Sequence, residues 1–213
     1  PKLPQRISNV VFMGMGEPLA NYENVKRTLK TWLTYTDIGP THLTVSTVGL
    51  LPMLEKILTD PDWPAVRLAV SLHSADAKTR KEVVPTSHDQ FLKNLENWGR
   101  RYLKRFGNRR HHLTFEYVML RNVNDTDAHA EKLARLAVSL DRLKVNLIPY
   151  NFTDGKYQRS LDSQIERFKA RLEKDGVAVM VRKTMGDDIA AACGQLITLG
   201  SKTKTCDSVE FLR

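Results

Sequence analysis

The sequence predicts an α/β protein: a partial (β/α) barrel of the TIM type, built on a parallel sheet. Short apolar runs rich in β-branched residues alternate with longer stretches of helical period, and the runs recur at about the length of a βα unit. Neither a G-x-G-x-x-G nor a Walker loop occurs, which disfavours the competing open, doubly wound nucleotide-binding sheet. Polar residues and glycines follow successive runs, where a parallel barrel places its ligand-binding residues.

Six short runs are expected to form buried parallel strands, because each is rich in Val, Ile, Leu or Phe. They comprise residues 10–13, 43–47, 66–72, 113–120, 144–149 and 177–182. Six strands are fewer than the eight of a closed barrel. We therefore expect an incomplete barrel, truncated at its N-terminal side.

Six stretches between and after these runs have the spacing of amphipathic helices. They comprise residues 23–35, 51–58, 75–83, 88–106, 126–140 and 161–175. The fifth can be capped by Asp125 or Thr126, and it carries an apolar stripe that includes Ala130 and Leu133. Gly176 directly follows the sixth, as a glycine that ends a helix commonly does.

The composition is that of a globular chain with an excess of positive charge. Of the 213 residues, 41% are hydrophobic and 27% are charged, and the net charge is +9. These values exclude a disordered or collagen-like chain and are compatible with a polyanionic partner. No run approaches the roughly 18 apolar residues of a membrane-spanning helix, and no secretory pattern occurs, so we expect a cytoplasmic protein that does not bind membranes.

Cys193 and Cys206 are the two cysteines of the sequence. Two cysteines exclude a disulfide framework and any zinc or iron–sulfur site built from several local thiolates. We therefore expect no metal ligands in this chain.

Residues able to bind a polar ligand follow the predicted strands. The first run leads into Gly14-Met15-Gly16-Glu17-Pro18, where glycines let the backbone approach a ligand and Glu17 can accept from an ammonium group. Further candidates at strand ends are Ser46, Thr47, Ser71, His73 and Asn151, and Glu116 lies within the fourth run. Taken singly, the segment Gly14–Pro18 is equally well explained as a tight turn, whereas a strand-end hydroxyl or a lone histidine is better explained as a helix cap or a structural hydrogen bonder. The prediction of a site depends on their combination.

Six motifs occur in order between Val10 and Leu196: Gly-Met-Gly-Glu-Pro, Ser-Thr-x-Gly, Ser-Leu-His, Glu-Tyr-Val-Met-Leu with Val-Asn-Asp, Asn-Leu-Ile-Pro-Tyr-Asn, and Gly-Asp-Asp-Ile-x-Ala-Ala-Cys-Gly-Gln-Leu. Together they resemble the RlmN/Cfr family of radical S-adenosylmethionine (SAM) RNA methyltransferases. Pro18 and the pair Asp187 and Asp188 resemble the RlmN branch, which methylates C2 of an adenine, rather than the Cfr branch, which acts at C8.

This resemblance implies a set of site residues and a fold of the radical SAM kind. In the family a strand-end Gly-Glu binds the amino group of SAM, which falls here on Gly16 and Glu17. The other cofactor-binding positions carried over by motif are Ser46, Ser71, Leu72, His73 and Asn151. Cys193 matches the cysteine that is essential for catalysis in the family.

The resemblance also implies the chemistry of the family. The essential cysteine takes a methyl group from one SAM; a second SAM, cleaved reductively at a [4Fe–4S] cluster, gives a 5′-deoxyadenosyl radical. That radical removes a hydrogen atom from the S-methyl group, and the methylene radical adds to the adenine carbon. The implied substrate is 23S ribosomal RNA, with transfer RNA open as a second substrate. The implied electron donor is of the reduced flavodoxin type, and we expect a monomer.

The sequence departs from the family in the cluster-binding segment. The family's Cys-x-x-x-Cys-x-x-Cys is absent, and two cysteines cannot provide three cluster thiolates. Because the chain also begins at Pro1, we expect an inactive C-terminal piece of a longer enzyme. Residues 1–213 are expected to form one domain, with the barrel at about 1–183 and the catalytic-cysteine loop and tail at 184–213.

Two other functions remain open from the sequence. One is a non-catalytic RNA- or ligand-binding module derived from the same barrel. The other is an unrelated barrel enzyme that uses Glu17, His73 and Glu116 in acid–base chemistry. For RNA contacts, the basic run at residues 100–110 is expected to be mainly a solvated surface, whereas Arg182, Lys183, Lys202 and Lys204 are better candidates for binding phosphates.

Overall fold

A computed structural model describes residues 7–107, 113–141, 143–151 and 156–182 of the chain. Its strands lie at the six places that the sequence pattern predicts, each within three residues of the expected bounds. They are β1 (Val10–Phe12), β2 (Leu43–Thr47), β3 (Arg67–Ser71), β4 (Leu113–Met119), β5 (Leu143–Pro149) and β6 (Ala178–Val181).

The helices also follow the predicted order. They are α1 (Tyr22–Tyr35), α2 (Leu51–Thr59), α3 (Ala77–Val83), α4 (Phe91–Phe106), α5 (Asp127–Val138) and α6 (Asp162–Lys174), with short 3₁₀ helices η1 (Pro18–Asn21) and η2 (Pro40–His42). Within the described ranges, no helix combines the length and the apolar character needed to cross a membrane.

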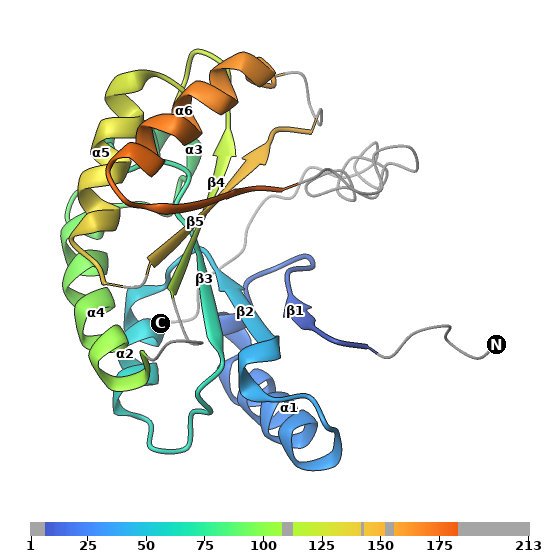
Figure 1. Ribbon diagram of the computed structural model, residues 1–213. Helices are drawn as coiled ribbons and strands as arrows, with labels where there is room; N and C mark the ends of the chain where they lie inside the picture. The colour runs from blue at the N-terminus through green and yellow to red at the C-terminus, as the bar shows by residue number, and fades with distance from the viewer. Residues whose placement is uncertain (1–6, 108–112, 142, 152–155, 183–213) are drawn as a thin grey trace, which may run out of the picture.

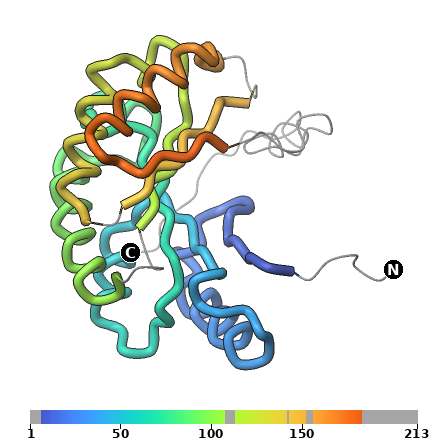
Figure 2. The backbone as a smooth tube through the Cα atoms, in the orientation of Figure 1, coloured from blue at the N-terminus to red at the C-terminus, as the bar shows by residue number. Residues whose placement is uncertain are grey.

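The strands form one parallel sheet in the order β1-β2-β3-β4-β5-β6. Each new strand is added on the same side of the previous one, so the order never reverses as it does in a doubly wound sheet. Right-handed crossovers in one direction place the helices on one side of the sheet. Figures 1 and 2 show α2, α4, α5 and α6 along that side. This arrangement confirms the predicted partial barrel.

The two faces of the sheet differ in polarity because side chains alternate along each strand. On β2, Leu43 and Val45 are fully buried, whereas Thr44 and Ser46 on the opposite face are half-buried. The buried face packs against apolar helix residues to form the core. The other face is therefore free to carry polar side chains toward the interior of the incomplete barrel.

Two aromatic side chains join helix α4 to α2 and to the residue that precedes β3. Trp98 and Tyr102 are fully buried and stacked, with ring centroids 4.8 Å apart. The Trp98 indole N–H donates to the Leu54 carbonyl at 2.8 Å, and the Tyr102 hydroxyl donates to the Val66 carbonyl at 3.0 Å. These bonds satisfy the buried polar atoms that such aromatics bring into a core.

Two element boundaries differ from the predicted ones for identifiable reasons. Helix α3 begins at Ala77 rather than residue 75 because the Asp76 carboxylate accepts from the Thr79 N–H at 2.9 Å and caps the helix. Strand β3 ends at Ser71 because His73 has a left-handed φ of +57°, which turns the chain out of the sheet.

Candidate functional site

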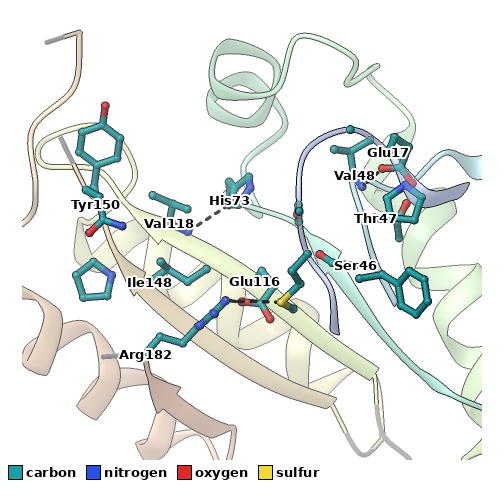
Figure 3. Close-up of a pocket in the computed structure, with 18 residues that line it drawn as sticks. Glu17, Ser46, Thr47, Val48, His73, Glu116, Val118, Ile148, Tyr150 and Arg182 are labelled. Carbon is teal, nitrogen blue, oxygen red and sulfur yellow. Dashed lines mark hydrogen bonds and ion pairs between the residues drawn. The ribbon is translucent and has the colours of Figure 1, made fainter. Parts of the chain in front are cut away.

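A cavity of about 370 Å³ lies at the carboxyl ends of the strands (Figure 3). Residues of β1 to β5 line it, and Arg182, which directly follows β6, also does, since parallel strands end at the same edge of the sheet. Its volume lies within the roughly 300–1,000 Å³ of small-molecule sites. The lining residues are Phe12, Met13, Gly14, Gly16, Glu17, Pro18, Ser46, Thr47, Val48, Ser71, His73, Glu116, Val118, Ile148, Pro149, Tyr150, Asn151 and Arg182.

Most of the predicted cofactor-binding residues meet in this cavity. Those that line it are Gly16, Glu17, Ser46, Ser71, His73 and Asn151. Leu72 does not, because its side chain is fully buried in the core. Cys193 lies outside the described residues. The expectation that strand-end residues distant in sequence share one cavity is confirmed, whereas their role in binding remains a prediction.

Glu17 joins the loops that follow β1 and β2. Its Oε1 accepts from the Leu19 N–H at 2.9 Å and caps η1, and its Oε2 accepts from the Val48 N–H at 2.7 Å. Each carboxylate oxygen has a further lone pair, so Glu17 can also accept from a ligand ammonium group. The neighbouring Gly16 has a φ of +87°, a conformation that favours glycine.

His73 presents a neutral imidazole to the cavity. Its Nδ1 lies 3.2 Å from the Val118 backbone nitrogen and accepts the hydrogen bond, which leaves the ring proton on Nε2 (Figure 3). Burial, assisted by the nearby Arg80 guanidinium, lowers the pKa of His73 to about 4. The ring therefore stays uncharged at neutral pH and can act as a hydrogen-bond donor through Nε2.

Glu116 is a carboxylate in the cavity that the motif comparison did not assign to the cofactor. It is 3% exposed, and its Oε1 accepts from the Asn146 amide at 2.9 Å. Its Oε2 has no hydrogen-bond partner among the described residues, and the Arg182 Nη1 lies 3.8 Å away. Burial raises the pKa of Glu116, although Asn146 and Arg182 oppose this.

An apolar wall forms one side of the cavity. Val118 and Ile148 are paired across β4 and β5 and line the cavity with Pro149 and Tyr150. In Figure 3 the side chains of Val118, Ile148 and Tyr150 lie opposite Glu17, and His73 and Glu116 lie between them. Strand periodicity could have found this wall, because Val118 is two residues from Glu116 and thus on the same face. The arrangement suits an elongated ligand with an ammonium group at one end and an apolar ring at the other.

Arg80 is a buried side chain next to the cavity that bonds to two residues lining it. It is 1% exposed, and its Nη2 donates to the carbonyls of Val48 at 3.1 Å and Ser71 at 3.3 Å. Its guanidinium also stacks over the Phe91 ring, 3.8 Å from the centroid. Burial lowers the pKa of Arg80 to about 10. Arg80 thus joins the ends of two strands that carry cavity residues.

The basic run of α4 lies away from this cavity. Helix α4 ends before β4 begins, so its last turns lie near the amino ends of the strands, opposite the cavity. Several of its charges are paired within the molecule: Arg100 with Glu96 at 2.7 Å, and Arg101 with Glu55. The described part of the run, residues 100–107, is therefore a surface of the helix layer. Of the predicted phosphate-binding residues, Arg182 lines the cavity, whereas Lys183, Lys202 and Lys204 lie outside the described residues.

The described residues contain no group of three or more His, Cys, Asp or Glu side chains arranged to hold a metal ion. The polar side chains that line the cavity are carboxylates, hydroxyls, an imidazole, an amide and a guanidinium. Such groups bind an organic ligand through hydrogen bonds and charge.

Comparisons with known proteins agree with the resemblance to radical SAM methyltransferases that the sequence motifs show. The model of the radical SAM superfamily matches residues 2–137. The chain is 45% identical over 195 residues to the dual-specificity RNA methyltransferase RlmN of Alcanivorax borkumensis, a match that covers 90% of this chain and 50% of the relative. The chain thus spans about half the length of the curated relatives it matches.

Solved structures support the same assignment. A radical SAM methyltransferase from Sphaerobacter thermophilus superposes with a TM-score of 0.81 at 39% identity, covering 90% of this chain and 55% of that one. A domain of a pyruvate-formate lyase-activating enzyme from Bacteroides vulgatus shares the fold, with a TM-score of 0.63 at 20% identity over 83% of this chain and 99% of that one. On its sequence, its sheet order and these matches, the chain belongs to the radical SAM superfamily.

Proposed function

We propose that this chain binds S-adenosylmethionine in the strand-end cavity and is part of an enzyme that methylates C2 of an adenine in RNA. The observation that carries the proposal is the convergence of Gly16, Glu17, Ser46, Ser71, His73 and Asn151 on one cavity of suitable size. These residues follow several different strands and are selected by motif, without regard to their positions in space. The RNA specificity rests on the likeness to the RlmN relatives.

The shape and charge of the cavity suggest an orientation for the cofactor. SAM has an ammonium and carboxylate at one end, a sulfonium and ribose in the middle, and an adenine at the other end. In the proposed orientation, Glu17 receives the ammonium, and Ser46, Ser71 and His73 bind polar atoms between the ends. The adenine lies against Ile148 and Val118, with Asn151 reading its polar edge. Leu72 contributes by holding the strand end from within the core.

The chain does not fit the iron–sulfur cluster that radical SAM chemistry uses. A site-differentiated [4Fe–4S] cluster needs three thiolates, and the sequence has only Cys193 and Cys206. The described residues contain no cysteine at all. The part that we assign to this chain is therefore the binding and orientation of SAM and the exclusion of water.

Cys193 is the proposed carrier of the methyl group. Its thiolate attacks the sulfonium methyl carbon; a C–S bond forms, the bond from carbon to the sulfonium breaks, and S-adenosylhomocysteine leaves. A carrier is needed because the electron-poor C2 carbon of adenine is not a nucleophile and cannot take the methyl group by simple displacement. We propose that residues 184–213 bring this cysteine to the barrel of residues 1–183.

The proposed RNA substrates are ribosomal RNA and transfer RNA, and the target adenine must leave its stack to reach the site. Arg182, 41% exposed at the cavity, is the proposed contact to a neighbouring phosphate. Such substrates imply a cytoplasmic enzyme. The proposal further includes a monomeric state and a reduced electron donor of the flavodoxin type.

SAM binding to this chain tests the proposal. We expect Glu17→Gln to weaken binding by about 10-fold, because a charge-assisted hydrogen bond of about 1.5–3 kcal/mol becomes a neutral one. Glu23→Gln is the matched control, since Glu23 pairs with Lys56 on the surface and does not line the cavity. Calorimetric titration measures both. Equal affinities for wild type and Glu17→Gln would contradict the assignment.

A non-catalytic RNA-binding module is the second candidate, and the count of two cysteines favours it. The two candidates differ in their dependence on Cys193. In the methyltransferase, Cys193→Ala abolishes the transfer of radiolabelled methyl groups to RNA in cells that express the whole enzyme of which this chain is part. In a binding module, the same variant binds RNA with unchanged affinity and no methylation is seen with either protein.

A further inference from the structure

The turn between β4 and α5 contains a buried asparagine that the proposed site does not use. Asn124 is 0% exposed, and each polar atom of its side chain has a partner. Its Nδ2 donates to the carbonyls of His73 and Val118, both at 2.7 Å, and its Oδ1 accepts from the Leu120 N–H at 2.8 Å. This pattern of two donors and one acceptor is one that an asparagine amide can satisfy.

His73, the residue that Asn124 contacts, needs such support. Its φ of +57° is a left-handed conformation that costs a non-glycine residue about 1–2 kcal/mol. Three hydrogen bonds hold it there. Its N–H donates to the Glu116 carbonyl at 3.2 Å, its Nδ1 accepts from the Val118 N–H at 3.2 Å, and its carbonyl accepts from Asn124.

Asn124 and His73 both form hydrogen bonds with the backbone of Val118, so the three residues form a closed hydrogen-bond network. Val118 donates its N–H to the His73 imidazole and accepts on its carbonyl from the same Asn124 amide that holds the His73 carbonyl. The amide therefore fixes both the backbone of His73 and the strand residue that orients its ring. Tyr117 holds the turn in place, since its hydroxyl donates to the Asn124 carbonyl at 2.7 Å.

We propose that Asn124 is the positioning residue for His73: it locks the imidazole into the tautomer that carries its proton on Nε2 and faces the cavity. Its consequence for cofactor affinity rests on the proposed function, in which His73 binds SAM. Asn124 does not line the cavity and acts only through His73. The Val-Asn-Asp motif thereby acquires a role in the site.

Asn124→Asp tests the proposal with a side chain of nearly the same shape. The carboxylate keeps the acceptor for Leu120 but removes both donors, so it faces two carbonyls and repels them. Asn124→Ser removes the amide donors without burying a charge. Ser160→Ala is the matched control: the Ser160 hydroxyl is buried and donates to Asp125 at 2.7 Å in the same turn, without touching His73.

The first readout is NMR of the ligand-free chain labelled with ¹³C and ¹⁵N histidine, with the His73 signals assigned by their loss in His73→Gln. We expect wild type and Ser160→Ala to show the Nε2–H tautomer alone. Asn124→Asp and Asn124→Ser should show a mixture with the Nδ1–H tautomer. The second readout is the Kd for SAM, expected to rise about 10-fold in the two Asn124 variants and less than about 2-fold in Ser160→Ala.

Each outcome decides the proposal. A folded Asn124 variant that keeps the wild-type tautomer overturns the proposal. A wild-type protein whose His73 carries the proton on Nδ1 also overturns it, and this measurement does not depend on whether a variant folds. If wild type fails to bind SAM, the proposed function fails, while the tautomer comparison still decides the role of Asn124.

Discussion

At the scale of single residues, the site is distinguished by polar groups held out of water. Glu116 and Arg80 are buried and His73 is half-buried, and each lies at or just behind the cavity. Burial displaces all three pKa values toward the uncharged form. Perturbed groups that gather at one cavity are typical of binding and catalytic sites rather than of structural cores.

Glu116 gives a pH-dependent prediction. Its folded pKa is raised above the ordinary value of 4.5, so the native state binds its proton more tightly than the unfolded chain does. Its contribution to stability is fully present below pH 4.5 and is lost as the pH rises through the folded pKa. The physical reason is that a buried carboxylate is poorly solvated, whereas the protonated carboxyl carries no charge.

We therefore expect the stability of wild type relative to Glu116→Gln to fall as the pH rises above 4.5. Denaturant unfolding at several pH values measures this difference. Glu131→Gln, with its side chain 52% exposed on α5, is the control and should show a much flatter dependence. A difference between wild type and Glu116→Gln that does not change with pH would contradict the raised pKa.

At the scale of elements, local pattern predicted the strands and helices well because each has a clear hydrophobic period. The buried positions of α5, including Ala130 and Leu133, are those of the predicted stripe. The boundaries that differ depend on side-chain bonds that the period does not contain. Asp76, for example, caps α3 and also pairs with Lys132 of α5, so that one carboxylate fixes both where a helix starts and where it docks.

Asp76 is expected to stabilise the docking of α3 on α5 in a pH-dependent way. The Lys132 ammonium and the Thr79 N–H lower the pKa of Asp76 from 3.8 to about 2. The resulting stability, about 1 kcal/mol once solvent screening of the partly exposed pair is included, is present above pH 3.8 and is lost as the pH falls through about 2. Asp76→Asn keeps the cap acceptor but loses the ion pair.

We expect Asp76→Asn to be less stable than wild type by about 1 kcal/mol at pH 7, with the difference vanishing near pH 2. Urea unfolding at the two pH values measures it. Asp89→Asn is the control, because the Asp89 side chain is 84% exposed and its pairing with Lys81 is long, at 3.4 Å. An Asp76 variant as stable as wild type at pH 7 would show that the ion pair contributes nothing.

At the scale of the whole molecule, the parallel sheet places the candidate binding site at one edge and the ion-paired end of α4 at the opposite edge. All carboxyl ends lie at one edge and form the cavity, while the amino ends carry the last turns of α4 with their paired arginines. The net charge of +9 is therefore not evenly available to a polyanion. The arginines of α4 that form ion pairs are partly neutralised by their partners, whereas Arg182 lines the cavity, where a bound ligand could reach it.

RNA binding tests this separation of charge. We expect Arg182→Gln to weaken the binding of an adenine-containing RNA hairpin and to reduce the slope of log K against log salt by about one. Arg101→Gln should leave the affinity and slope nearly unchanged, since Arg101 does not line the cavity and pairs with Glu55. Filter binding across a salt series measures both. The reverse order of effects would place the RNA on α4 instead of at the cavity.

The sequence by itself determined the order and kind of the elements, the incomplete parallel barrel and most of the residues that line the cavity. The reason is that the carboxyl ends of parallel strands all lie at one edge of the sheet, so residues that follow the strands come together there. Tertiary structure decided what depends on distant groups meeting: that Leu72 turns into the core while His73 faces the cavity, and that Arg182 approaches Glu116 from the far end of the described chain. It also decided that Asn124 holds His73, 51 residues away. The hydrophobic periodicity of a strand or helix shows which face of the element a residue lies on. Hydrogen bonds between loops depend instead on how the strands are arranged in the folded sheet.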